Sequence, residues 1–134
     1  MKILLDTNIL VAAFTTKGIC DDLLEFCLKE HTIISSQALL DELQNVFYRK
    51  FKIPKDKVEA IIDFLEGQIS VVEPVSVLMT IRDKDDLKVL AAAKAAKADV
   101  IITGDKDLLV LEEFEDIPIL PPREFLKFIN KRKR

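Results

Sequence analysis

The stretch Lys2–Asn8, KILLDTN, decides the fold because a short apolar run stops there at an acid. The apolar run before Asp6 predicts a short buried strand. Further short apolar runs occur at 32–34, 71–72, 100–102 and 117–120. Segments with helical character lie between or after these runs, at 21–28, 39–47, 58–65 and 86–97, as a short helix after the turn at 103–107, and after 122. This alternation predicts the α/β class, as a three-layer α/β/α sandwich with a mostly parallel sheet of four to five strands.

Length and composition predict one domain with a substantial core, because 49% of the 134 residues are hydrophobic. We assign this domain to residues 1–130 and regard 131–134, KRKR, as a basic tail. No apolar run approaches the roughly 18 residues that a membrane span needs. The run before Asp6 is also too short for a secretory leader, so we expect a cytoplasmic protein with no membrane partner.

The net charge argues against a general nucleic-acid binder, and the cysteine spacing argues against a fold held by a disulfide. The net charge is −3, and without the four basic residues of the tail 16 basic and 23 acidic residues leave −7. An acidic body argues against broad electrostatic capture of nucleic acid, although the tail offers cations to phosphates. Cys20 and Cys27 are two helical turns apart, too far for a disulfide, so we expect buried thiols.

Three acids lie next to predicted strands, and each can be assigned to the carboxyl end or the amino end of its strand. The carboxyl ends of parallel strands meet at one edge of a sheet, where functional crevices lie. Asp6 ends the first strand, and Asp105 follows the fourth. Asp99 precedes the fourth strand, at the opposite edge, and is therefore expected to be a surface residue.

Helical periodicity sorts the remaining acids in the same way. Glu42 lies about 100° from the centre of the apolar face of its helix, whereas Asp41 lies about 160° away. Glu42 is therefore expected to border the buried face and Asp41 to face solvent. Asp86 heads a stripe of apolar residues, and Asp83 and Asp85 share that position less cleanly.

Each of these acids has a structural alternative as a helix cap or a flanking charge. Carboxylates that converge on one crevice repel, however, and together they call for a cation. Carboxylate oxygens with an Asn nearby suit Mg²⁺ or Mn²⁺, whereas zinc sites need more Cys and His than this chain has. With His31 as the sole histidine, cleavage by a pair of histidines is excluded, and metal-activated water is the remaining route to phosphodiester hydrolysis.

Four motifs in order resemble the PIN domain family, in particular the small prokaryotic single-domain proteins that include VapC-type toxins. They are LLDTNIL at Leu4–Leu10, LLDEL at Leu39–Leu43, DKDDLKVLAAA at Asp83–Ala93 and TGDKDLL at Thr103–Leu109. The resemblance implies a ribonuclease dependent on Mg²⁺ or Mn²⁺. It implies these catalytic and metal-binding acids: Asp6, Glu42, Asp86 and Asp105. Supporting roles fall to Asn8, Thr103 and Asp107, with Asp83 as the second choice for the third acid.

The resemblance also implies partners, and it leaves alternatives. An endoribonuclease of this family takes RNA as substrate, and a toxin would pair with an antitoxin and form a homodimer. A non-catalytic PIN scaffold that binds RNA or protein is the first alternative. A haloacid-dehalogenase-type phosphatase is a weaker one, because its proton-donating acid would stand at Asn8. A response-regulator receiver needs adjacent acids, and Leu5 precedes Asp6. Tyr48 is the one aromatic residue considered for base stacking, with packing at a helix end as its alternative.

Overall fold

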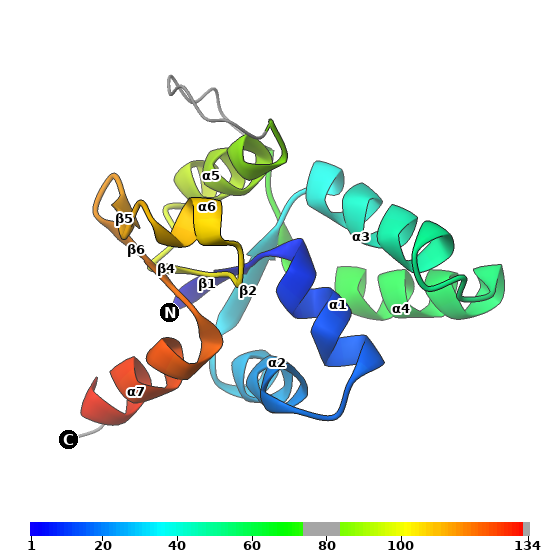
Figure 1. Ribbon diagram of the computed structural model, residues 1–134, viewed down its shortest axis with the longest axis horizontal. Coiled ribbons are helices and arrows are strands. Elements are labelled where there is room, and N and C mark those ends of the chain that lie inside the picture. Colours follow the sequence, from blue (N-terminus) through cyan, green and yellow to red (C-terminus); the bar gives the residue numbers. More distant parts are fainter. Residues whose placement is uncertain (74–83, 133–134) are drawn as a thin grey trace.

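Strands are interspersed with single helices or pairs of helices along the described residues, 1–73 and 84–132, of the computed structural model (Figure 1). In chain order the elements are β1 (Lys2–Leu5), α1 (Thr7–Thr15), α2 (Ile19–Glu30), β2 (Thr32–Ser35), α3 (Gln37–Arg49), α4 (Lys55–Gln68), β3 (Ser70–Val71), α5 (Lys84–Ala96), β4 (Val100–Ile102), α6 (Lys106–Leu109), β5 (Glu113–Phe114), β6 (Ile117–Leu120) and α7 (Pro122–Arg132). Within these ranges no helix has the length and apolar character needed to cross a bilayer.

The strands form one sheet in the order β3-β2-β1-β4-β6-β5. All neighbouring pairs are parallel except β5 with β6. The mostly parallel sheet is therefore confirmed, and the described residues form six strands where four to five were predicted. β1 lies between β2 and β4, and its register places Leu5 opposite Ile102. The ends of the two strands that precede Asp6 and Asp105 are thus side by side.

The strands divide their side chains between two helical layers. Ile3 and Leu5 join a buried cluster with residues of α1, α2, α4 and α7, whereas Leu4 between them joins a second cluster with residues of α5. This division follows from the two-residue period of a strand. α3 contributes to both clusters, with Leu39 in the second and Leu43 in the first. Figure 1 shows α5 and α2 on opposite sides of the strands, which confirms the α/β/α sandwich.

Two elements were not predicted from the sequence, and each has a physical reason. α1 is apolar almost all round between Ile9 and Phe14, so it lacks the polar face that marks an amphipathic helix. β5 has two residues, too few for a recognisable apolar run. The turn between β5 and β6 contains Glu115 and Asp116 at φ of 47° and 68°. Positive φ at both central residues is typical of type I′ hairpin turns. Such turns are usually recognised by the sequence Asn-Gly or Asp-Gly, whereas this turn has Glu-Asp.

The last helix reaches into the segment predicted as a basic tail, 131–134. α7 continues through Lys131 and Arg132, so the helix backbone includes the first half of the basic segment. Lys133 and Arg134 lie outside the described residues.

The core makes a prediction that uses two neighbouring residues of α4. The Leu65 side chain is fully buried, whereas Phe64 beside it is 47% exposed. We expect Leu65→Ala to lower the free energy of unfolding by about 2–5 kcal/mol, because a buried cavity is left. The matched variant Phe64→Ala should change it by less than about 0.5 kcal/mol. Urea denaturation measures both, and equal losses in the two variants would contradict this packing.

The cysteines make a second prediction, from pH and thiol chemistry. Cys27 is fully buried and Cys20 half-buried, and burial raises the pKa of the Cys27 thiol to about 12. Because the pKa is higher in the folded state, this thiol favours folding at pH values below its ordinary pKa of 9.0 and ceases to do so as the pH rises towards 12. In a reagent assay at neutral pH, Cys27 should react only after denaturation. Rapid labelling of both thiols in the native protein would overturn the prediction.

Candidate active site

Asp6 stands where β1 ends and α1 begins. Its backbone N–H donates to the Ile102 carbonyl (3.0 Å), so the chain keeps the sheet pairing up to this residue. One carboxylate oxygen, Oδ1, accepts from the Thr7 N–H at 2.7 Å and caps α1. The other, Oδ2, accepts from the Thr103 hydroxyl at 2.7 Å. Asp6 is 7% exposed, so both its position and its orientation are fixed by buried contacts.

Thr103 links the ends of the two central strands. It follows β4, is fully buried, and its hydroxyl also accepts from the Asp105 N–H at 3.0 Å. Asp105 in turn accepts from the Asp107 N–H at 2.8 Å and caps α6. Asn8 is exposed, and its Oδ1 accepts a 3.5 Å hydrogen bond from the Gly104 N–H. A continuous series of hydrogen bonds therefore connects Asp6 with the loop that carries Asp105.

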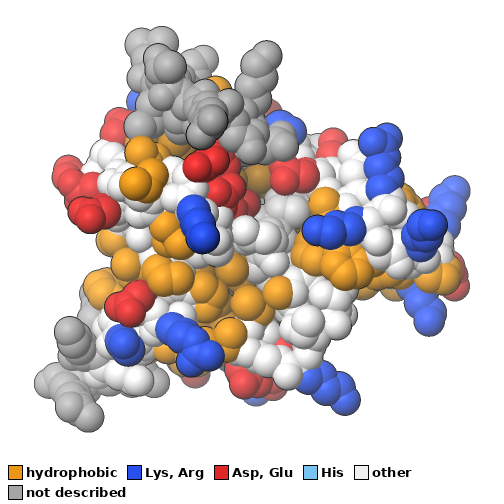
Figure 2. All heavy atoms as spheres, in the orientation of Figure 1, with side chains coloured by type: hydrophobic (Ala, Val, Ile, Leu, Met, Phe, Trp, Pro, Cys, Tyr) orange, Lys and Arg blue, Asp and Glu red, His pale blue; other side chains and the backbone are white. Residues whose placement is uncertain are grey.

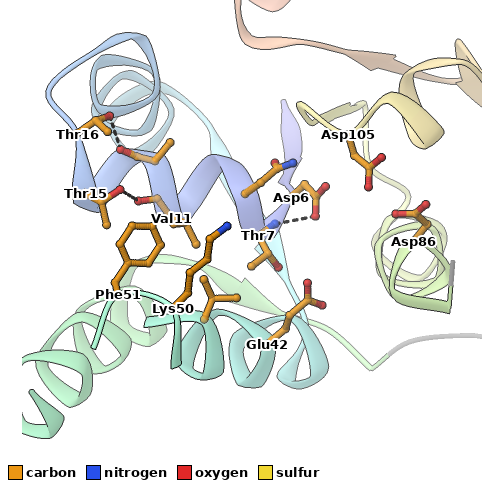
Figure 3. A pocket seen from close by; sticks show the side chains of 13 residues that line it. Asp6, Thr7, Val11, Thr15, Thr16, Glu42, Lys50, Phe51, Asp86 and Asp105 are labelled. Carbon is orange, nitrogen blue, oxygen red and sulfur yellow. Dashed lines mark hydrogen bonds between the residues drawn. The ribbon is translucent and has the colours of Figure 1, made fainter. Parts of the chain in front are cut away.

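Glu42 and Asp86 come to the same place from two helices. Glu42 on α3 is half-buried and Asp41 beside it is exposed, as the helical periodicity predicts. Asp86 lies in the first turn of α5 and is 3% exposed. Both line a cavity of about 530 Å³ that Asp6 and Asp105 also line. Figure 3 shows these four carboxylates around one part of the cavity.

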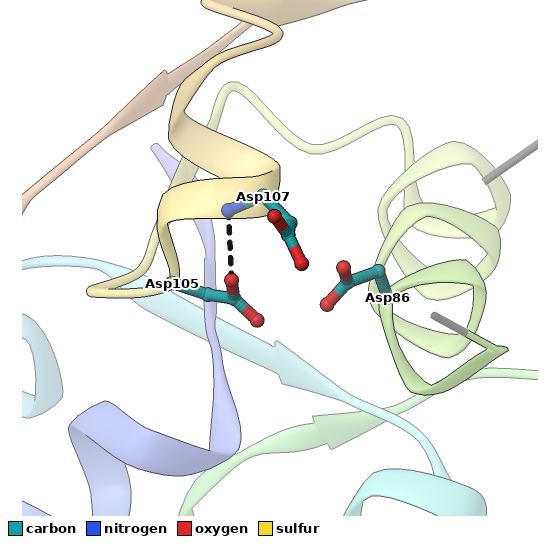
Figure 4. Close-up of side chains that lie close together, drawn as sticks. All are labelled: Asp86, Asp105 and Asp107. Atoms are coloured by element: carbon teal, nitrogen blue, oxygen red, sulfur yellow. Dashed lines mark hydrogen bonds between the residues drawn. The ribbon is translucent and has the colours of Figure 1, made fainter. Parts of the chain in front are cut away.

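Three carboxylates lie close enough to share a cation. Asp86, Asp105 and Asp107 each offer an oxygen, and these atoms all lie within 4.8 Å of one another (Figure 4). Like charges at this separation repel, and a bound cation or a proton relieves the repulsion. A donor group made only of carboxylate oxygens fits a hard divalent cation such as Mg²⁺ or Mn²⁺. Asp107, predicted only as a supporting residue, belongs to this group, whereas Asp6 and Glu42 lie beside it in the cavity.

The surface near the cavity has two kinds of charge. On the face shown in Figure 2, acidic side chains gather near α5 and α6, and apolar and basic side chains lie over α3 and α4. Lys106, the first residue of α6, is exposed beside Asp105. The acids therefore occupy one side of the site, with cations at its border.

Other residues singled out from the sequence lie elsewhere. Asp83 falls outside the described residues, so only Asp86 of the two candidates is placed. Asp99 is exposed at the opposite end of β4, where it accepts from the Lys2 N–H at 2.7 Å. Tyr48 is half-buried, packs against the first core cluster and accepts a 3.5 Å hydrogen bond from Gln44, so the packing interpretation holds.

Several residues that line the cavity were not predicted from the sequence, among them Thr7, Lys50 and Phe51. Thr7 stands inside the opening motif, between Asp6 and Asn8. Lys50 and Phe51 follow the last residue of α3, where no periodic pattern applies. The only signal was an aromatic residue in a polar connection.

Comparison with known proteins gives a family and a fold. The sequence matches the family model of the PIN domain over residues 2–107. In all, 11 chains of solved structures match. One belongs to the crystal structure of VapBC2 from Rickettsia felis bound to a DNA fragment from their promoter; it has a TM-score of 0.63 and 20% sequence identity, and the match covers 89% of this chain and 97% of that chain. No curated protein matches the chain.

The acidic group predicts opposite effects of one substitution with and without metal. Asp105→Asn keeps a good helix cap and removes one negative charge. In EDTA we expect its melting temperature to exceed that of the wild type by about 2–5 °C, because repulsion falls. Millimolar Mn²⁺ should stabilise the wild type by mass action and the variant much less. Differential scanning calorimetry measures both, with Asp63→Asn on the exposed face of α4 as control. A variant less stable than the wild type in EDTA would contradict the predicted repulsion among the three carboxylates.

Proposed function

The chain belongs to the PIN domain family, and on that basis we propose that it is a cytoplasmic endoribonuclease dependent on Mg²⁺ or Mn²⁺. One observation carries the proposal: Asp6, Glu42, Asp86 and Asp105 line a single cavity although they come from separate elements. Two of them follow adjacent parallel strands, and the other two lie on helices that flank the sheet edge. This convergence supports metal-assisted hydrolysis more than a role as scattered caps.

Asp86, Asp105 and Asp107 would hold the cation, with Asp6 and Glu42 beside them. When bound, such a cation supplies an acidified water and stabilises charge on phosphoryl oxygens. The chain's own contribution is to fix the acids in advance. The Thr103 hydroxyl and the Thr7 N–H both donate to Asp6, and donors of this kind stabilise a carboxylate charge.

The acidic walls also determine how a substrate is oriented. Without a cation they repel a phosphodiester, so RNA enters productively only when the charge is compensated. Lys106 lies at the border of the acids, where an ammonium group can contact a neighbouring phosphate. Attack by water in line with the scissile bond breaks the bond between phosphorus and the 3′ oxygen. The products are 5′-phosphate and 3′-hydroxyl ends.

We further propose that the protein is the toxin of a toxin–antitoxin pair, with an antitoxin partner and a homodimeric form. The likeness of its fold to a chain of VapBC2 supports this assignment. Growth arrest on expression of the wild type, with normal growth for Asp6→Asn, would test the toxin role.

The alternatives lack a supporting observation. A non-catalytic scaffold would not need carboxylates gathered in one cavity. A phosphatase of the haloacid-dehalogenase type needs an acid at the position of Asn8, whose amide is instead engaged with Gly104.

The proposed activity is tested by cleavage of 5′-labelled single-stranded and hairpin RNA with Mg²⁺, Mn²⁺ or EDTA. We expect metal-dependent cleavage by the wild type and a loss of at least about 100-fold in Asp6→Asn and Glu42→Gln. Asp41→Asn, next to Glu42 and exposed, should retain activity within about twofold. Circular dichroism checks that each variant is folded. Cleavage that persists in EDTA or in Asp6→Asn would contradict the proposal.

A further inference from the structure

The cavity extends well beyond the acids. Its other half is lined from α1 by Val11 and Thr15 and from the end of α3 by Val46, Lys50 and Phe51 (Figure 3). The proposed hydrolysis uses none of these residues. The whole cavity, about 530 Å³, falls within the range of about 300–1,000 Å³ typical of ligand sites. Hydrolysis at the four acids would not by itself require a cavity of this volume.

Phe51 is presented to the cavity by a fixed backbone. Its N–H donates to the Val46 carbonyl at 3.3 Å, and the Ile53 N–H donates to the Phe47 carbonyl at 3.0 Å. Lys52 between them is in the left-handed region, with φ of 50°. The turn is thus well connected, yet the Phe51 side chain is 42% exposed. An aromatic ring held at the wall of a cavity, outside the core, is suited to stacking against a flat ligand.

Polar groups along the cavity indicate the charge of that ligand. Lys50 is exposed, and Figure 3 shows its side chain reaching across the cavity towards α1. Thr7, between Lys50 and the acids, is 5% exposed, and its Oγ1 has no hydrogen-bond partner among the described residues. Thr7 therefore contributes to the cavity wall, while its hydroxyl oxygen is itself shielded from solvent. The order along the cavity is therefore acids, Thr7, ammonium and aromatic ring.

We propose that this half of the cavity is a subsite for a single-stranded nucleotide next to the scissile phosphate, with its base stacked on Phe51 and its phosphate beside Lys50. The proposal rests on the ribonuclease function. A nucleotide fits the order of groups because it joins an anion to a flat aromatic ring. A paired base hides its face in the duplex, so the subsite selects unpaired RNA.

A fluorescent residue at position 51 tests the stacking directly. The chain has no tryptophan, so Phe51→Trp provides a single reporter. We place it in the Asp6→Asn background with Mg²⁺, so that the probe is not cut, and titrate it with an oligoadenylate of about eight nucleotides. We expect the tryptophan fluorescence to be quenched in a saturable way. The midpoint of quenching should equal the midpoint of binding measured by fluorescence anisotropy of the labelled oligonucleotide. Phe64→Trp, an exposed aromatic position outside this cavity, should stay unchanged.

Kinetics and salt dependence supply independent readouts. Phe51→Ala should raise KM for single-stranded RNA by about 5- to 100-fold with kcat nearly unchanged, and Phe51→Tyr should restore it. Lys50→Ala should reduce the slope of log affinity against log salt by about 0.7, whereas Lys57→Ala, an exposed lysine of α4, should not.

The outcomes separate the subsite from the nuclease function. Oligonucleotide binding without quenching of Phe51→Trp overturns the subsite, even where the wild type cleaves RNA, and leaves the cavity to an occupant of another class, such as a protein segment. Quenching without cleavage under any metal supports the subsite and refutes the nuclease. Equal quenching by a duplex overturns the selection for unpaired RNA.

Discussion

The buried hydrogen bond between Thr103 and Asp6, 2.7 Å long, is the contact on which the site depends. It joins the ends of the two central strands, and through the Asp105 N–H it also holds the loop that brings in Asp105 and Asp107. Because a hydroxyl can donate and accept at once, a single buried side chain fixes two acids that lie far apart in sequence. The helices add Glu42 and Asp86 to a framework that is already in place.

Placing several carboxylates in one cavity opposes folding, and the surrounding core must offset this cost. The strands beneath the site are buried on both faces, with Leu4 and Ile101 in one cluster and Leu5 and Ile102 in the other. These strands are short, so the acids lie only a few residues from the deepest part of the core. The framework therefore has little freedom to move the acids apart when no cation is bound.

Much of this arrangement is predictable from the sequence, because it follows from periodicity and strand direction. The positions of Asp6 and Asp105 follow from the ends of apolar runs, and the difference between Glu42 and Asp41 follows from a helical angle. Elements without a periodic signal escaped prediction, namely the uniformly apolar α1 and the two-residue β5. Phe51 escaped for a related reason, since its exposure results from the path of a turn that depends on tertiary contacts and on a positive φ at Lys52.

Asp6 has two tasks, and they differ in what they require of the side chain. Capping α1 needs only an oxygen that accepts from the Thr7 N–H, which Asn or Ser provides nearly as well. The proposed metal binding needs the negative charge. Asn at this position would keep an oxygen for the Thr7 N–H and lose the charge, whereas Ser would also leave the Thr103 hydroxyl without its acceptor. Under the proposed nuclease function, we expect relatives that have lost the activity to carry Asn at residue 6 before any change appears in the core.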